Sequence, residues 1–350
     1  MAATMTPHGP PLDLTHGRVE MSHGAGGRAM AQLIDQLFAA AFANPLLAQG
    51  NDQAVFTPPP GRLALATDTY VIRPRRFPGG DIGSLAVHGT VNDLAMGGAE
   101  PLYLTAGFVL EEGLPLGELA AIVKSMAAAA SAAGVAIVTG DTKVVEHGHG
   151  DGVYINTAGL GVIRDPGLDL SGANARPGDA VLVSGTLGDH GMAVMAEREG
   201  LAFDPPLLSD SAPLGGLVAA LLAAVPETRT LRDPTRGGLA ATLNELAAQS
   251  GVGMVLEEAA LPIRPGVRGA CELLGIEPVN VANEGKLVAI VPAARAEAAL
   301  AALKAHPLGR EAALIGHVTD DAARRVEMVT TLGGRRVIDW LAGEQLPRIC

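Results

Sequence analysis

The sequence predicts a two-domain protein of the mixed α/β class with antiparallel strand pairing, and three observations lead to this prediction. The chain has 350 residues, which is enough for about two domains of roughly 150 residues each. Hydrophobic residues make up 48% of it and charged residues 18%, so material for packed cores is ample. Short apolar strand patterns alternate with helical patterns along the whole chain.

In the first half of the chain, apolar residues between Met30 and Ala41 recur at helical spacing and predict a helix over 27–42. The mostly apolar segment 82–96 predicts a second helix, interrupted by Asn92 and Asp93. A third helix is expected over 116–133, with Gly134 ending it. The strands expected in this half are 63–67, 101–110, 135–139 and 153–163.

Two turn-rich segments, 164–167 and 176–179, predict a domain boundary near Ser171. Beyond it, the patterns predict helices over 190–199, 214–224 and 237–250, and strands over 180–184, 253–256, 286–291 and 314–318. We therefore expect a flexible leader (1–20), an N-terminal domain (21–170), a C-terminal domain (171–338) and a flexible tail (339–350).

Composition excludes several classes of protein. A net charge of −12 and an aromatic content of 3% disfavour nucleic-acid binding, which needs basic faces or stacking platforms. The apolar runs at 126–138 and 217–225 fall short of the roughly 18–20 residues of a membrane helix, and the N-terminus has no signal-peptide pattern. Two cysteines suit a reducing compartment. We expect a cytoplasmic protein that binds neither nucleic acid nor membrane.

Four aspartates lie next to Gly, Thr or Asn near the ends of apolar segments, namely Asp68, Asp93, Asp141 and Asp233. Carboxylate oxygens are the ligands that Mg²⁺ takes when it bridges phosphates. Each aspartate alone is better explained as a cap or a turn residue. Four of them in similar settings favour a metal–phosphate site.

Paired glycines accompany these aspartates at 24–27, 79–80, 97–98 and 237–238. Backbone amides at such positions approach phosphates closely, most favourably at a helix start. Arg236, directly before Gly237 and Gly238, would add a fixed cation. Neither a Walker-type phosphate loop nor a dinucleotide fingerprint is present in the sequence.

Two further residues could move a proton. Lys143 follows Asp141, and Glu284 lies between two apolar strands. An acid and a base from the two domains could shuttle a proton between them, although a surface ion pair explains either residue alone.

The histidines and cysteines give weaker signals. His147 and His149 are better explained as a polar hairpin tip than as metal ligands. Cys271 sits in an apolar helical pattern and is expected in the core. Cys350 is the last residue, and a thiol on a tethered tail can visit a distant site, although an inert terminal thiol is the simpler interpretation.

Six segments resemble the HypE family of carbamoyl dehydratases, which are maturation factors of NiFe-hydrogenases. The resemblance extends from Met21 to Cys350. The terminal Pro-Arg-Ile-Cys is highly specific. The Asp and Gly motifs alone are shared with the wider PurM-like superfamily of ATP-using enzymes, which includes aminoimidazole ribonucleotide synthetase and selenophosphate synthetase. The segments are 22–27, 140–145, 184–191, 233–238, 283–286 and 347–350.

This resemblance implies two PurM-like α/β domains and an ATP site in a cleft completed at a homodimer interface. It also implies a reaction. A partner carbamoyltransferase, HypF, places a carbamoyl group on the terminal thiol. ATP then phosphorylates the carbamoyl oxygen, and loss of phosphate leaves a thiocyanate. The cyanide passes to a HypC–HypD scaffold and becomes an iron ligand of the hydrogenase.

Carried over to this chain, the resemblance implies that Cys350 bears the reacting group. Mg²⁺ would be held by Asp68, Asp93 and Asp233, and Asp141 would hold a second metal ion or orient the first. Lys143 and Glu284 are the candidates for removing the amide protons, and the sequence does not decide between them. The residues implied in ATP binding are Asp68, Asp93, Asp141, Thr142, Asp189, Asp233, Thr235, Arg236, Gly237 and Gly238.

Two other functions compete with this one. A different PurM-like small-molecule kinase or synthetase would leave Cys350 without a role. Selenophosphate synthetases usually carry a reactive Cys or Sec in the N-terminal Gly-rich loop, where this chain has Ser22 and His23. A nickel-handling protein would have to use His147, His149 and Cys350, which is a poor ligand set.

Overall fold

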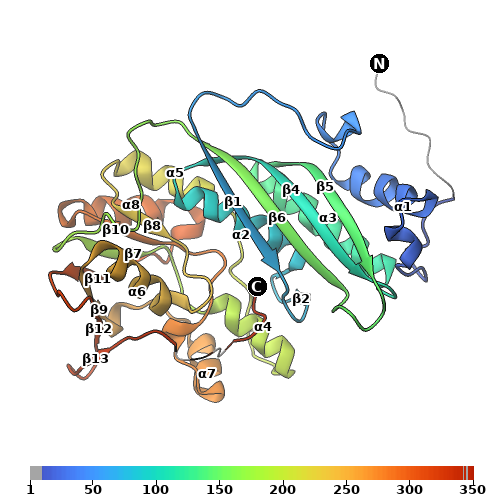
Figure 1. Ribbon diagram of the computed structural model, residues 1–350. Coiled ribbons are helices and arrows are strands. Elements are labelled where there is room, and N and C mark those ends of the chain that lie inside the picture. The colour runs from blue at the N-terminus through green and yellow to red at the C-terminus, as the bar shows by residue number, and fades with distance from the viewer. Residues whose placement is uncertain (1–9, 342, 344–345) are drawn as a thin grey trace.

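The computed structural model describes residues 10–341, 343 and 346–350, and it contains two large β-sheets that follow each other along the chain (Figure 1). The first has four strands in the order β1-β6-β4-β5. Strands β4 and β5 are parallel, and the other neighbours are antiparallel. The strands are β1 (Arg62–Tyr70), β4 (Glu100–Glu111), β5 (Ala136–Val145) and β6 (Val153–Ile163), and a separate two-stranded ribbon comprises β2 (Arg76–Phe77) and β3 (Gly80–Asp81).

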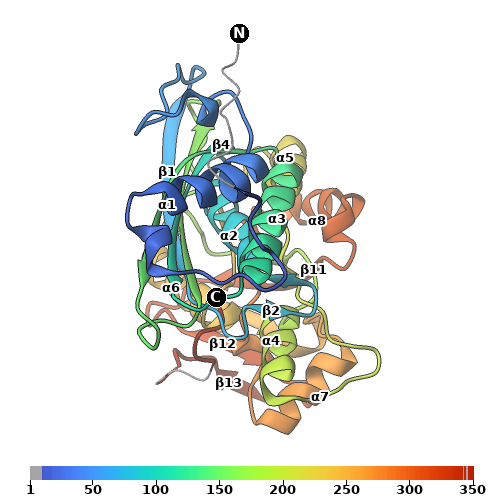
Figure 2. The same cartoon turned by 90° about the vertical axis from the view of Figure 1, so that its right-hand side faces the viewer.

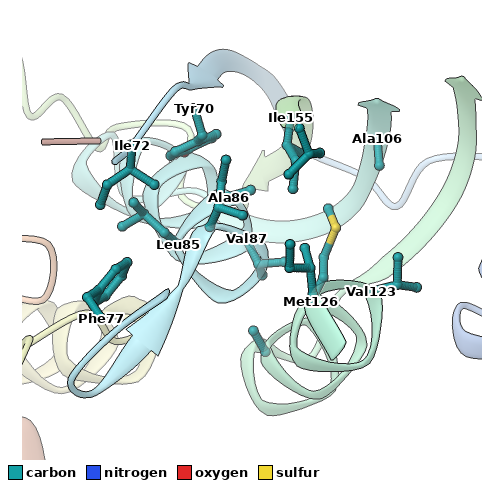
Figure 3. Close-up of a cluster of buried hydrophobic side chains, with 14 of the residues drawn as sticks. Tyr70, Ile72, Phe77, Leu85, Ala86, Val87, Ala106, Val123, Met126 and Ile155 are labelled. Atoms are coloured by element: carbon teal, nitrogen blue, oxygen red, sulfur yellow. The ribbon is translucent and has the colours of Figure 1, made fainter. Parts of the chain in front are cut away.

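Helices α2 (Ile82–Met96) and α3 (Leu116–Ala133) cover one face of this sheet (Figure 2). Figure 3 shows Tyr70 and Ile155 of the sheet beside Ala86 and Val87 of α2. The Asp81 carboxylate caps α2 by accepting hydrogen bonds from the amides of residues 83 and 84. The predicted helix over 82–96 is confirmed: Asn92 and Asp93 interrupt its apolar pattern but not its backbone, and Asn92 forms hydrogen bonds to Ala212 and Leu214 outside the helix.

The opposite face of the four-stranded sheet has no covering layer in the described part of the chain. Leu63 and Leu65 on β1 are 54% and 77% exposed on this face. The side chains of a strand alternate between the two faces of a sheet, and Asp68 and Tyr70 lie on the helix side. The sheet therefore has one buried face and one open, partly apolar face.

The N-terminal segment packs beside β5 and α3. The predicted helix over 27–42 is confirmed as α1 (Arg28–Leu33) followed by a π-helical turn (Ile34–Ala39). The expectation of a flexible leader is wrong for residues 10–20, because Val19 is buried and its amide donates to the Leu114 carbonyl. Residues 1–9 lie outside the described part. Short 3-10 turns are Met21–Gly24 and Leu47–Gln49.

The second sheet has seven strands in the order β13-β12-β9-β11-β7-β10-β8. All pairs are antiparallel except β9 with β12. One hydrophobic cluster contains Val181 and Leu243, and another contains Leu182 and Leu217, so successive residues of β7 belong to different cores. The strands are β7 (Ala180–Val183), β8 (Thr230–Arg232), β9 (Gly253–Glu257), β10 (Val288–Val291), β11 (Ala313–Thr319), β12 (Val326–Val329) and β13 (Arg335–Val337).

Helices pack on both sides of the second sheet and between the sheets. The N-terminal core includes Met192 of α4 and Val267 of α7, so it extends beyond the first sheet. Helix α8 and strands β12 and β13 were not predicted, and α7 and β8 were indicated only through Cys271 and Asp233, without bounds. The helices are α4 (Asp189–Glu199), α5 (Gly215–Ala224), α6 (Gly238–Ser250), α7 (Pro265–Leu274) and α8 (Ala296–Ala305).

The chain ends in the middle of the molecule, next to α4 and the segment after β1 (Figures 1 and 2). Ile349 is buried in the N-terminal core, and the Cys350 carbonyl accepts a hydrogen bond from the Val71 amide. The expectation of a flexible tail therefore does not describe this conformation for residues 346–350. Residues 342, 344 and 345 lie outside the described part.

By length and composition, α3 alone among the described helices is apolar enough to cross a membrane. The sequence estimate of the longest apolar run was too short, because it missed the window 116–133. Leu119, Ile122 and Met126 of α3 are fully buried in the N-terminal core, as in a core helix.

Candidate active site

Four carboxylates from separate elements share one region between the two sheets. Asp68 lies in β1, Asp93 in α2, Asp233 directly after β8, and Glu284 before β10. Their charges act on one another: Asp68 and Asp233 both raise the pKa of Asp93, and all three aspartates raise the pKa of Glu284. The predicted metal aspartates, Asp68, Asp93 and Asp233, are therefore brought together with the predicted base.

The local positions of two aspartates differ from the sequence prediction. Asp68 lies within β1 rather than at its end, because the antiparallel ladder to β6 continues to Tyr70. Asp93 lies in the fourth turn of the uninterrupted helix α2. Asp233 was correctly placed after a strand, although that strand, β8, has only three residues.

Burial is the main cause of the perturbed acidities in this region. It raises the pKa of Asp93 to about 7 and that of Asp233 to about 6, and neighbouring carboxylates add to the effect. Burial also raises the pKa of Glu284 well above its usual value. Arg232 opposes the shifts at both aspartates without cancelling them. The region thus holds more negative charge than its surroundings compensate.

Glu284 is 4% exposed, and its Oε1 atom has no hydrogen-bond partner among the described residues. Its backbone is fixed from two sides. The amide donates to Asp210 Oδ1 at 3.1 Å, and the carbonyl accepts from Asn92 Nδ2 at 3.3 Å. The backbone is therefore held while one carboxylate oxygen stays unsatisfied, as expected for a group that meets a ligand or a substrate.

Cys350 reaches the same region. Burial raises the pKa of its thiol to about 12, the charges of Glu284 and Asp68 raise it further, and Arg236 lowers it. The docked thiol is consequently protonated at neutral pH and is a poor nucleophile. Arg236, predicted as a phosphate-binding cation, is thus near the terminal cysteine.

The loop that carries Arg236 has a demanding backbone. Gly237 and Gly238 have φ values of 77° and 60°, and a Cβ on Gly238 would lie 2.6 Å from two carbonyl oxygens. The Thr235 carbonyl closes the turn by accepting a hydrogen bond from the Gly238 amide at 2.9 Å. Asn283 braces the loop, because both its amide and its Nδ2 donate to the Pro234 carbonyl.

Asp189 is the first residue of α4. Its charged neighbours are Arg264, Asp210 and Lys286, and not the three aspartates predicted to hold the metal. It accepts a hydrogen bond from Thr186 and is 3.6 Å from Arg264 Nε. Burial raises its pKa, and Asp210 acts in the same direction. Asp210 in turn pairs with the partly buried Lys286 at 3.1 Å.

Asp141, Thr142 and Lys143 lie elsewhere in this chain. Strand β5 does not end before Asp141 as predicted but continues to Val145 alongside β4. Lys143 Nζ is 2.7 Å from Asp141 Oδ2, and both side chains are more than 60% exposed on the open face of the sheet. The hydrogen bond with Lys143 is the main cause that lowers the pKa of Asp141. The predicted meeting of Lys143 and Glu284 within one chain does not occur.

The residues present fit a divalent cation. Within the described ranges, no three His, Cys, Asp or Glu side chains form a preassembled metal cluster. Mg²⁺ that is bound to nucleotide phosphates needs only one or two protein carboxylates, however. Asp93 is exposed and Asp233 is half-buried, so both are oxygen donors that a cation could reach, and a cation would relieve their mutual repulsion. His147 is exposed beside Glu111 and forms no such site.

Several residues of this region were missed by sequence analysis. Asp210, His190 and Arg198 all have long-range partners: the Glu284 amide, the Ile349 carbonyl and the Pro347 carbonyl, respectively. Only His190 stood inside a recognised segment, and no spacing in the sequence indicated the other two.

Family models of AIR synthase related proteins match this chain twice. The model of the N-terminal domain matches residues 50–163, and that of the C-terminal domain matches residues 176–329. Together they contain both sheets up to β12, including all four carboxylates of the candidate site.

Individual proteins are similar over almost the full length. The carbamoyl dehydratase HypE of Azotobacter vinelandii is 66% identical over 97% of this chain and 99% of its own. A solved structure of the hydrogenase maturation protein HypE with ATP is 51% identical, covers 94% of this chain and 99% of its own, and has a TM-score of 0.91. HypE in a solved HypE–HypF complex is 50% identical, covers 88% and 99%, and has a TM-score of 0.78.

Proposed function

The chain belongs to the HypE family of AIR synthase related proteins, and on this premise we propose that it is an ATP-dependent carbamoyl dehydratase acting on its own Cys350. One observation carries the proposal for this particular chain. The terminal cysteine is docked where the charges of Glu284, Arg236 and Asp68 reach its thiol. A substrate group on that sulfur would lie among acid, base and phosphate-binding side chains.

The overall reaction is R–S–C(=O)–NH₂ + ATP → R–S–C≡N + ADP + phosphate. The carbamoyl oxygen is a poor leaving group, and transfer of a phosphoryl group from ATP converts it into a good one. Cleavage of the C–O bond then releases phosphate, while the two amide protons are removed and the C≡N bond forms. The chain must bind ATP, hold the carbamoyl group in line with it and accept protons.

We assign proton removal to Glu284. Its backbone is fixed by Asp210 and Asn92, and its free Oε1 faces no other donor in the described part of the chain. A carboxylate whose pKa is raised by burial is a stronger base once it has lost its proton. The same burial keeps water away from the reacting carbon.

Asp68, Asp93 and Asp233 would hold Mg²⁺ together with the phosphates of ATP. When bound, Mg²⁺ offsets the charge on the transferring phosphoryl group. The loop 235–238 would contribute Thr235, Arg236 and backbone amides to the phosphates, helped by its left-handed glycines. Asp189 supports this region through its Arg264 and Thr186 contacts.

We propose that two copies of the chain pair through the open face of the four-stranded sheet. Leu63 and Leu65 give this face an exposed apolar part, whose burial would favour association. Asp141, Thr142 and Lys143 lie on the edge strand β5 of the same sheet. Any role of Lys143 in proton transfer, or of Asp141 in ATP binding, would then be exercised across the interface, whereas the Thr142 side chain is buried on the other face of the sheet.

The partners of the reaction follow from the same assignment. The similar HypE in the solved complex binds HypF, and we propose that a carbamoyltransferase of that kind loads Cys350 of this chain. A HypC–HypD scaffold would receive the cyanide for the iron centre of a NiFe-hydrogenase. These steps take place in the cytoplasm.

The test is the mass of the C-terminal peptide after incubation with the carbamoyltransferase, carbamoyl phosphate and Mg–ATP. We expect a carbamoyl adduct on Cys350, followed by loss of one water only when ATP is hydrolysable. The matched control, Cys350→Ser, keeps the size of the side chain and loses the thiol, so it should remain unmodified. An unmodified Cys350 beside a transferase that modifies a known acceptor would favour the alternative, a PurM-like small-molecule kinase.

A further inference from the structure

The last four residues of the chain are held by their backbone. Arg198 donates from Nη1 to the Pro347 carbonyl at 2.8 Å and from Nη2 to the Arg348 carbonyl at 2.9 Å. His190 Nε2 is 2.8 Å from the Ile349 carbonyl. The amides of Arg73 and Val71 donate to the carbonyls of Arg348 and Cys350, both at 3.2 Å. Every carbonyl from Pro347 to Cys350 therefore has a donor.

The hydrogen-bond network defines the protonation state of His190. The ring is completely buried, and Nε2 faces a carbonyl oxygen, so Nε2 carries the hydrogen. Nδ1 then accepts from the Ser209 hydroxyl at 2.8 Å, while Ser209 Oγ accepts from the Ser211 amide at 3.1 Å. Burial lowers the pKa of His190, in agreement with a neutral ring. His190 is thus a fixed single donor to the tail.

Arg198 is also held in place, because its Nε donates to the Arg73 carbonyl at 2.8 Å. Its guanidinium therefore joins α4, the segment after β1 and the tail. A planar guanidinium with five donors suits this arrangement, whereas an ammonium group would bond fewer carbonyls at once.

The side chains of the tail define its register. Ile349 is 2% exposed within the N-terminal core, and Arg348 Nε donates to the Val71 carbonyl at 3.0 Å. Arg348 Nη1 also pairs with Asp151 at 2.8 Å. With the register set by residues 348 and 349, the thiol of Cys350 lies within reach of the charges of Glu284 and Arg236.

We propose that His190 and Arg198 are positioning residues that clasp the backbone of residues 347–349 and so keep Cys350 docked at the candidate active site. The proposal deepens the proposed function and rests on it for the purpose of docking. The clasp itself is a property of the uncarbamoylated chain, so it is testable without the reaction.

The test uses the reactivity of Cys350 in the full chain towards iodoacetamide at pH 8, measured from the mass of the C-terminal peptide. Alkylation requires a thiolate, and the docked thiol has a pKa raised to about 12, so alkylation reports undocking. We expect His190→Leu and Arg198→Met each to accelerate alkylation of Cys350 by about tenfold, since the first removes one buried hydrogen bond to the tail and the second removes two that are partly buried or exposed.

Matched variants and an internal thiol complete the design. His190→Gln keeps a donor near the position of Nε2 and should stay within about twofold of the wild type. Cys271, which is 2% exposed, should react at its wild-type rate in every variant. Unchanged alkylation of Cys350 in both His190→Leu and Arg198→Met would overturn the proposal. A parallel rise at Cys271 would also overturn it, by assigning both residues to general packing.

The reaction gives a second readout. Once the tail is carbamoylated, single-turnover dehydration should slow in His190→Leu and Arg198→Met and recover in His190→Gln. If alkylation follows this order and no variant or wild-type chain forms thiocyanate, the clasp stands and the proposed function fails. If the wild type forms thiocyanate and alkylation does not respond, the clasp alone fails.

Discussion

Asp68 and Lys143 project from opposite faces of the same four-stranded sheet. Asp68 pairs in register with Thr157, which is buried beneath α2, whereas Lys143 pairs with Val109 on the open face. The two predicted halves of the site are thus separated by the sheet itself. In a single chain, Asp68 and Glu284 act on the docked Cys350, whereas Lys143 lies on the other side of the sheet.

Replacing Glu284 by Gln should separate ATP binding from dehydration. The amide keeps the size of the side chain and the backbone contacts but cannot accept a proton. We expect nucleotide affinity within a few-fold of the wild type and a single-turnover dehydration rate lower by about 10²-fold or more. The measurement is quenched-flow mass analysis of the carbamoylated tail.

The matched control for this change is Glu297→Gln, because Glu297 is exposed on α8, away from the site. It should turn over at the wild-type rate. Full turnover by Glu284→Gln would remove Glu284 from proton transfer and leave Lys143 of a second copy as the remaining candidate.

The acids of the candidate site predict how stability depends on pH in the metal-free protein. The folded-state pKa of Asp93 is raised from 3.8 to about 7, so its stabilising contribution is complete below pH 4 and is lost as the pH rises through 7. Because Asp93 is exposed, solvent screening reduces this effect, and urea unfolding should give a free energy lower by only about 1 kcal/mol at pH 8 than at pH 5. Asp93→Asn should reduce this dependence, and the part that remains would come from Asp233 and Glu284, whose pKa values are also raised.

Mg²⁺ provides the second arm of the same experiment. If Asp93 helps to hold the ion, Mg–ATP should raise the unfolding temperature of the wild type at pH 8 and raise that of Asp93→Asn less. Equal stabilisation of both proteins by Mg–ATP would take Asp93 out of the metal site.

Helix boundaries were the part of the fold best predicted from sequence. The bounds of α2 and α3 agree with the predictions to the residue, because local groups define them: the Asp81 cap begins α2, and the left-handed Gly134 ends α3. Local signals failed where a ladder overrides them. Gly140 and Asp141 are typical of a turn, yet β4 pairs with β5 as far as Val145.

The candidate site was predictable only in part, for a physical reason. Asp68, Asp93, Asp233 and Glu284 stand in recognisable segments, and the structure brings them together. Asp210 and Arg198 act through hydrogen bonds to backbone atoms more than 70 residues away in sequence. Such contacts depend on tertiary packing and leave no periodic or compositional trace.

The open sheet face predicts an association that one charge should disrupt. Leu65 is 77% exposed, and Leu65→Lys would place an ammonium group in the proposed interface. We expect light scattering to show a dimer for the wild type and a monomer for Leu65→Lys at micromolar concentration. Leu332→Lys is the control, because Leu332 is 96% exposed in a turn outside that face. This variant should remain dimeric. A monomeric wild type would refute the proposed interface.

Two glycines with similar backbone angles separate conformational strain from steric clash. Gly238 and Gly251 have φ values of 60° and 70°. Gly238 is the first residue of helix α6, and Gly251 directly follows its last residue. A Cβ on Gly251 would meet nothing within 4 Å, so Gly251→Ala should lower the free energy of unfolding by only about 1 kcal/mol.

In contrast, a Cβ on Gly238 would lie 2.6 Å from the carbonyl oxygens of Val279 and Val281, so Gly238→Ala must displace backbone. We expect it to cost about 2 kcal/mol more than Gly251→Ala in urea unfolding. Displacement would also move Arg236 and Asp233 on the same loop, and ATP affinity should fall in Gly238→Ala alone. Equal stability and equal ATP affinity in the two variants would show that the loop adapts freely, and the assignment of residues 235–238 to phosphate binding would lose its structural basis.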